Sequence, residues 1–84
     1  MKSSTYASLV TLIFLKHKGK VSKSIESVIR ATDRLCDELE LEDNLSHMTK
    51  YRVISELLDS KILVVRKTSK NKRLKLSKNI IEIF

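Results

Sequence analysis

The chain has 84 residues, which is enough for one domain with one hydrophobic core and too few for two. Its hydrophobic content of 42% is typical of a folded globule, and its formal charge of +7 favours an anionic partner such as nucleic acid or a lipid surface. The single cysteine, Cys36, excludes a disulfide framework within the chain, so we expect a reducing, cytoplasmic location.

The longest apolar stretch, residues 7–15, is far shorter than the roughly 20 residues of a membrane span. The basic segment 16–20 follows it where a signal peptide would have its small-residue cleavage site. We therefore expect no membrane as a partner. One glycine and no proline predict a single compact domain over residues 1–84 with short connections.

A first helix is predicted over about residues 4–18, with Ser3 or Ser4 as its N-cap and Gly19 at its C-terminal end. Its apolar side chains cover most of the circumference instead of forming one stripe. We therefore expect this helix to be buried on several sides, either in its own core or against a second chain.

A second helix is predicted over about residues 23–41, capped by Ser22 or Ser24 and preceded by a short strand at 20–22. Its apolar residues follow the 3.6-residue period of a helix. A third helix is predicted over about residues 46–60, with a serine as its N-cap. The residues predicted on the inner face of the third helix are Tyr51, Ile54, Leu57 and Leu58.

Two β-strands are predicted after the third helix, over residues 62–67 and 73–77, and they form an antiparallel hairpin over about 62–76. Ser77 is predicted to cap a last helical turn over residues 78–84. The order helix, short strand, helix, helix, hairpin predicts an α+β, mostly α, fold. We expect a winged helix-turn-helix with three helices and a β-hairpin wing.

Residues 60–79 hold eight Lys and Arg and no acid. Like charges repel across a hairpin, whereas next to a phosphate backbone they release counterions and strengthen binding. We therefore expect the wing to bind double-stranded DNA, and the protein to be nucleoid-associated. The alternative is that these bases only deter aggregation at the strand edges. The candidate DNA-binding residues of the wing are Arg66, Lys67, Lys70, Asn71, Lys72, Arg73 and Lys75.

The third helix is the candidate to enter the major groove. Arg52 can donate two hydrogen bonds to guanine, while Ser46 and Thr49 can bond to phosphate or base. The alternative is an ordinary solvated helix face. The residues predicted to point outward or to flank that face are Thr49, Lys50, Arg52, Val53 and Glu56. The candidate DNA-binding residues of this helix are Ser46, His47, Thr49, Lys50 and Arg52.

The segment "VISELLDSKIL" at 53–63, with "LS" at 45–46 before it and the basic hairpin after it, resembles the C-terminal winged-helix domain of archaeal origin-recognition initiators, the Orc/Cdc family. The segments "LCDELEL" at 35–41 and "LVTLIFLKHKGKVS" at 9–22 are similar to that family's second and first helices. The resemblance implies an origin-binding domain with its third helix in the major groove and its wing in a neighbouring minor groove. A small transcriptional regulator is the other DNA-binding interpretation.

The chain departs from that family at several positions. Lys61 stands where the family usually has a glycine, and Met48 and Thr49 stand where it often has paired arginines. The segment "SKNK" at 69–72 replaces the family's glycine-arginine tip. The family's ATPase module has no counterpart, because a chain with one glycine holds no G-x-x-x-x-G-K-[ST] loop.

The histidines and the cysteine have no metal-ligand spacing, because His17, Cys36 and His47 lie on three different predicted helices. We therefore expect no metal ion and no cofactor. No pattern in the sequence is typical of a catalytic site, and we expect the protein not to be an enzyme.

Residues 33–43 hold six acids and one base. We expect a solubilising face opposite the DNA-binding side, and the alternative is a docking patch for a protein partner. The second class of function is accordingly a protein-interaction winged helix without specific DNA binding.

Residues 80–84 add four large apolar side chains at the end of a very small domain. Monomers rarely leave a large apolar patch in water, so we expect a homodimer through residues 4–18 and 80–84. The alternative is that residues 80–84 fold back on the first helix and complete a monomeric core.

Overall fold

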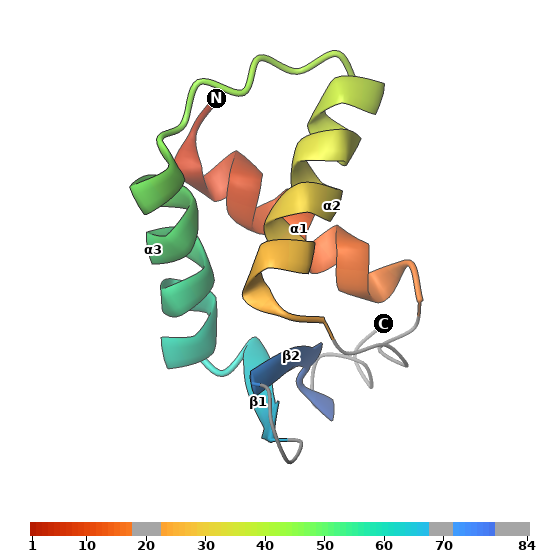
Figure 1. The fold of residues 1–84 in the computed structure, drawn as a ribbon, viewed down its shortest axis with the longest axis vertical. Helices are drawn as coiled ribbons and strands as arrows, with labels where there is room; N and C mark the ends of the chain where they lie inside the picture. The colour runs from red at the N-terminus through yellow and green to blue at the C-terminus, as the bar shows by residue number, and fades with distance from the viewer. Residues whose placement is uncertain (18–22, 68–71, 79–84) are drawn as a thin grey trace.

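The computed structural model describes residues 1–17, 23–67 and 72–78. Three helices precede a two-stranded antiparallel sheet, which confirms the predicted α+β, mostly helical, winged-helix-like arrangement (Figure 1). The elements are α1 (Ser3–Leu15), α2 (Ile25–Glu38), α3 (His47–Asp59), β1 (Leu63–Lys67) and β2 (Lys72–Leu76).

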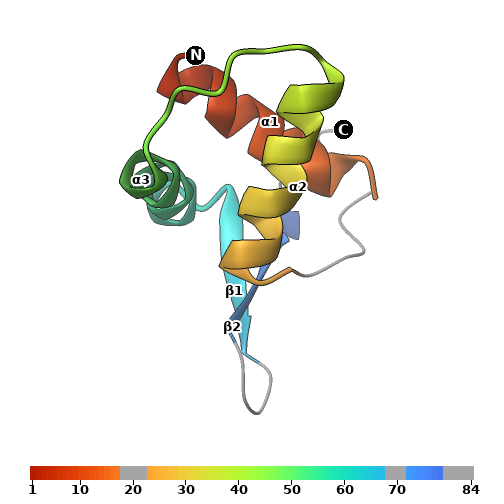
Figure 2. The same cartoon turned by 45° about the horizontal axis from the view of Figure 1, so that its top comes forward.

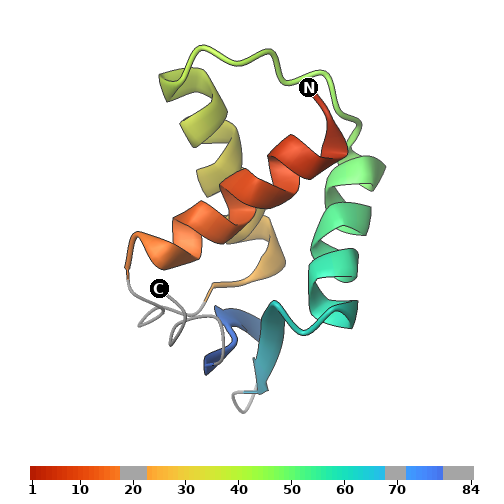
Figure 3. The same ribbon diagram turned by 180° about the vertical axis from the view of Figure 1, so that it is seen from behind.

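Helix α1 holds the other two helices together. Seen from behind, it crosses diagonally between α2 and α3, and it packs against both of them (Figure 3). The hairpin of β1 and β2 lies at one end of the molecule, and the connection from α2 to α3 lies at the other end (Figure 1). Turning the molecule shows the same hairpin extending away from the three helices (Figure 2).

The starts of α2 and α3 confirm two predicted caps. The Oγ atom of Ser24 accepts a hydrogen bond from the Ser27 backbone N–H at 3.3 Å, and Oγ of Ser46 accepts one from Thr49 N–H at 3.2 Å. The predicted cap of α1 is wrong. Lys2 holds the N-cap position without a side-chain hydrogen bond, because the helix already begins at Ser3.

Two residues after the end of α2 and of α3, the chain adopts a left-handed conformation, although neither residue is glycine. Glu40 has φ 56° and Lys61 has φ 63°. In each case the next residue donates its N–H back into the helix, from Leu41 to Cys36 O at 2.9 Å and from Ile62 to Leu57 O at 3.0 Å. Helix α2 therefore ends at Glu38 and not at the predicted 41.

Two predicted elements fall partly or wholly outside the described residues. These are the short strand at 20–22 and the helical turn at 78–84, of which only Lys78 is described; Gly19 is also outside. Helix α1 ends at Leu15 and not at the predicted 18. Lys23, the first described residue after residue 17, forms an isolated antiparallel bridge with Leu74 of β2.

The core lies where α1, α2, α3 and the hairpin meet. Three hairpin leucines are each about 1% exposed, so the base of the hairpin is part of the core and not an appendage. The core residues are Tyr6, Val10, Phe14, Val28, Ile29, Val53, Ile54, Leu57, Leu63, Leu74 and Leu76.

Candidate nucleic-acid interface

The register of the hairpin places bases directly opposite one another. Arg66 pairs with Arg73 and Lys67 pairs with Lys72 across the two strands. Like charges at directly opposite positions destabilise a strand pair, by up to about 1 kcal/mol for each pair. The hairpin therefore carries a charge pattern that lowers its own stability. This pattern favours binding to an anionic partner, which would relieve the repulsion.

The described side chains of β2 alternate between the core and the surface. Leu74 and Leu76 are buried, whereas Arg73 is exposed and Lys75 is half-buried. Because neighbouring side chains of a strand point to opposite faces, Arg73 and Lys75 share the face that the core leaves open. Neither base forms an ion pair with a described residue. The core thus holds the strand that carries these two bases, and neither base has an acidic partner in the described part of the chain.

Lys23 adds a base beside the hairpin that the sequence reasoning missed. Its N–H donates to Leu74 O at 2.9 Å, and Leu74 N–H donates to Lys23 O at 2.7 Å. These two bonds place the start of α2 along the free edge of β2. The available signal was the series of bases at 16–23, which we interpreted as a helix end, as evidence against a signal peptide and as a short strand.

Within α3, all of whose residues the structure describes, Arg52 is the exposed base. Met48, Arg52 and Glu56 follow one another at intervals of four residues and all three are exposed, so they share the outer face of the helix. Arg52 can donate to the O6 and N7 atoms of guanine, and Glu56 can accept from the N4 amino group of cytosine. This face is typical of contact with base edges more than with phosphates.

The first turn of α3 is occupied by local contacts. The hydroxyls of Ser46 and Thr49 are 2.8 Å apart and hydrogen-bonded to each other. The His47 ring packs edge-on against Tyr51, with 4.9 Å between the ring centroids. Ser46 and His47 remain exposed, but they lie at the end of α3 that is far from the hairpin (Figure 1).

The prediction that Lys50 and Val53 point outward or flank the outer face is wrong. Val53 is 3% exposed and belongs to the core, and Lys50 is 8% exposed. The Lys50 Nζ atom lies 2.7 Å from Oδ2 of Asp43 and 3.1 Å from Oδ1 of Asp33. A base that is buried and paired with two carboxylates has no free charge to offer a phosphate.

This buried ion pair continues into α1 and shifts several pKa values. The Tyr6 hydroxyl donates to Oδ1 of Asp33 at 3.2 Å, and burial together with the Asp33 charge raises the pKa of Tyr6. Burial opposes ionisation of Asp43, yet the hydrogen bond and charge of Lys50 hold the pKa of Asp43 below its ordinary value. Burial likewise opposes the charged form of Lys50, but Asp43 and Asp33 raise its pKa. The cluster therefore stabilises the charged forms of both Asp43 and Lys50.

The predicted acidic segment 33–43 divides into two parts. Asp33 and Asp43 are used internally to bind Lys50. The remaining acids are exposed at the end of the molecule opposite the hairpin (Figure 1). They are Asp37, Glu38, Glu40 and Glu42. Positive and negative charge are thus segregated along the long axis of the molecule.

The structure brings only some of the predicted DNA-binding residues together. Arg73 and Lys75 lie on the same strand, with Lys23 beside them. For three hairpin bases the structure gives the backbone position alone, and two further residues lie outside the described part of the chain. The first three are Arg66, Lys67 and Lys72, and the other two are Lys70 and Asn71.

Metal binding and membrane crossing find no support in the described part of the chain. No group of three or more His, Cys, Asp or Glu side chains there is arranged to hold a metal ion. Each helix there is too short or too polar to cross a bilayer.

Comparison of the chain with protein-family models, with curated proteins and with solved structures finds no match. The resemblance to the Orc/Cdc winged-helix domain therefore stays a prediction.

Proposed function

We propose that this protein is a non-enzymatic, double-stranded DNA-binding protein whose hairpin provides the main contact. The observation that carries the proposal is the charge pattern of the hairpin. Its register sets two pairs of bases directly opposite each other. The core holds the strand that carries Arg73 and Lys75, and neither base has an acidic partner among the described residues. Next to a phosphate backbone the same charges strengthen binding, because each neutralised phosphate releases condensed counterions.

Helix α3 contributes sequence preference in this proposal. Arg52 reads guanine from the outer face of the helix, and Glu56 on the next turn reads cytosine. Lys50 is not among the contacts, because Asp33 and Asp43 already hold its charge. The exposed acids at the far end of the molecule keep that end away from DNA, which supports the solubilising role over the docking role. A cytoplasmic, nucleoid-associated location belongs to the same proposal.

Fluorescence anisotropy with a labelled duplex selected from a random pool tests this function. We expect Arg73→Ser with Lys75→Ser to weaken binding to the selected and to a scrambled duplex equally. Arg52→Ala should cost about 1–3 kcal/mol on the selected duplex and much less on the scrambled one. The matched control is Lys2→Ser, an exposed base at the acidic end. An unchanged affinity of the double hairpin variant would contradict the proposal.

A second candidate function is protein binding without specific DNA recognition. The observation that favours it is the exposure of Leu39, Leu41 and Met48, three large apolar side chains on or beside the acidic connection. Such a surface suits a basic, apolar segment of another protein. The anisotropy experiment separates the two functions, because this candidate predicts no binding of either duplex even at low salt.

A further inference from the structure

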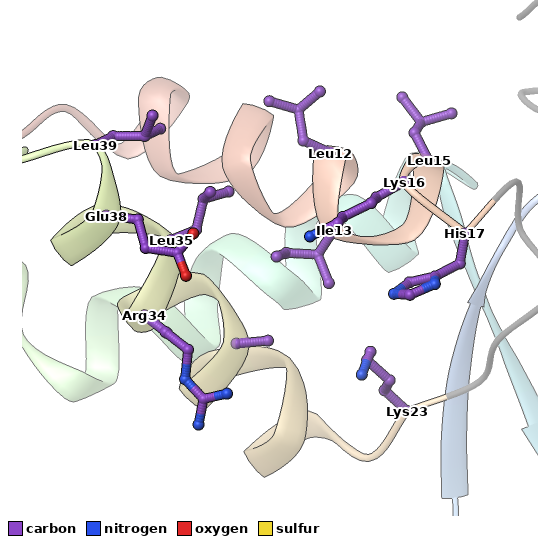
Figure 4. A pocket seen from close by; sticks show the side chains of 11 residues that line it. Leu12, Ile13, Leu15, Lys16, His17, Lys23, Arg34, Leu35, Glu38 and Leu39 are labelled. Carbon is purple, nitrogen blue, oxygen red and sulfur yellow. The ribbon is translucent and has the colours of Figure 1, made fainter.

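A groove of about 700 Å³ lies between the C-terminal halves of α1 and α2 (Figure 4). Ile13 points from α1 toward α2, and Leu35 points from α2 toward α1, so the two side chains form its apolar floor (Figure 4). Leu12 and Leu39 line the same groove and are 50% and 53% exposed. Described residues therefore leave a substantial apolar surface uncovered on one side of the helices.

The charged side chains along this groove are mostly basic. Three Lys and Arg residues line it against one acid, Glu38, so these bases exceed the acids by two. His17 and Lys23 face each other at one end of the groove (Figure 4). A segment that fills the groove should thus be apolar, with one or two negative charges. The three bases are Lys16, Lys23 and Arg34.

We propose that residues 80–84 of the same chain occupy this groove. The sequence there, "IIEIF", has four large apolar side chains and a single acid, Glu82, which is the composition that the groove requires. Burial of these apolar side chains against Ile13 and Leu35 removes both surfaces from water. The inference does not depend on DNA binding.

Residues 80–84 can reach the groove because one end of the groove lies beside strand β2. Lys23, at the basic end of the groove, is hydrogen-bonded in both directions to Leu74. Two residues later β2 ends at Leu76, and Ser77 N–H donates to Ile62 O at 3.0 Å. From Leu76 the chain reaches residue 80 over a span of up to about 14 Å, since an extended residue covers about 3.3–3.6 Å.

A tethered segment also has an advantage over a second copy of the chain. A short linker gives its segment an effective concentration in the millimolar range, whereas a second copy competes at its actual concentration. The segment of the same chain therefore fills the groove before a partner does. This arrangement favours a monomer over the homodimer through residues 4–18 and 80–84.

Disulfide trapping in the full chain tests the inference. In a Cys36→Ala background, Leu12→Cys together with Ile83→Cys should oxidise rapidly to a disulfide within one chain, at a rate that does not change on tenfold dilution. Met48→Cys with Ile83→Cys is the matched control and should form no such bond, since Met48 lies on α3. Disulfides that link two chains, or equal trapping in the control pair, would overturn the proposal.

Removal of residues 80–84 gives a second, independent readout. The truncated chain should bind a fluorescent apolar dye several-fold more strongly, and its melting temperature should fall by about 8 °C or more. Glu82→Gln in the full chain should lower the melting temperature by only a few degrees. Sedimentation of the full chain at micromolar concentration should give a monomer. A dimer, or a truncated chain that melts and binds dye like the full chain, contradicts the assignment.

Discussion

The Nζ atom of Lys50 in α3 lies 2.7 Å from Oδ2 of Asp43 in the connection that precedes the same helix. Asp33 of α2 forms an ion pair with the same Nζ at 3.1 Å and accepts a hydrogen bond from the Tyr6 hydroxyl of α1. One buried ammonium group therefore joins all three helices. Because α2 and α3 otherwise have little direct contact, this cluster fixes how α3 is presented.

Replacement of Lys50 should destabilise the fold. Lys50→Met retains the aliphatic stem but leaves the Asp33 and Asp43 carboxylates without their shared cation. Those side chains are 37% and 20% exposed, so we expect a loss of about 1–3 kcal/mol rather than the full cost of a deeply buried unpaired charge. Urea unfolding of the variant and of the unaltered protein measures this loss in the free energy of unfolding. Arg52→Met, on the exposed face of the same helix, is the control and should change stability by less than about 0.5 kcal/mol.

The same cluster predicts a loss of stability in acid. The pKa of Asp43 is lower in the folded protein than its ordinary value of 3.8, so the folded state binds fewer protons than the unfolded state near that pH. The contribution of Asp43 is complete above its ordinary pKa and disappears as the pH falls through the lowered pKa. Urea unfolding between pH 6 and pH 2 should show this loss, and Asp43→Asn should reduce it. An Asp43→Asn protein with the same acid dependence as the unaltered one would contradict the assignment.

Glycine at the end of α2 should stabilise the protein. Glu40 adopts φ 56°, a region that costs an ordinary residue about 1–2 kcal/mol and glycine almost nothing. After allowance for the greater freedom of glycine in the unfolded chain, Glu40→Gly should raise the free energy of unfolding by about 0.5–1 kcal/mol. Glu42→Gly, two residues away and without a positive φ, should give no gain. A gain of equal size at both positions would point to charge relief instead.

Arg73 should affect stability and DNA binding in opposite directions. Arg73→Thr removes the repulsion from the directly opposite Arg66 and introduces a residue that favours strands. We expect the free energy of unfolding to rise by about 0.2–1 kcal/mol. Duplex binding should weaken, and the slope of its salt dependence should become shallower by about 1, as expected for one phosphate fewer neutralised. If the bases only deter aggregation, the same change should promote aggregation and leave duplex binding unaltered.

Local patterns in the sequence are sufficient to predict much of this structure. Ser24 and Ser46 cap their helices as predicted, because a serine directly before the apolar residues of a helix is typical of an N-cap. The hairpin follows from its β-branched and alternating residues. The end of α2 was predicted wrongly because Glu40 adopts a left-handed conformation, which a glutamate in the sequence does not indicate.

The wrong assignment of Lys50 has a different cause. Helical periodicity assigns a face to each residue, but it does not show which neighbours cover that face. Lys50 is adjacent to the stripe of Val53, Ile54 and Leu57, and no local pattern places a lysine under the α2–α3 connection. Its burial depends on Asp33 and Asp43, which both lie outside its own helix. Only the tertiary structure brings those three side chains together.

The salt dependence of duplex binding tests the proposed function with one measurement. With about four to six phosphates neutralised by the hairpin and its neighbours, the logarithm of the association constant should fall with the logarithm of salt concentration at a slope of about −4 to −5. The measurement is fluorescence anisotropy of the full chain with a labelled duplex from 50 to about 300 mM salt, a range in which counterion release dominates. A slope near zero, or no binding at the lowest salt, would contradict DNA binding by this protein.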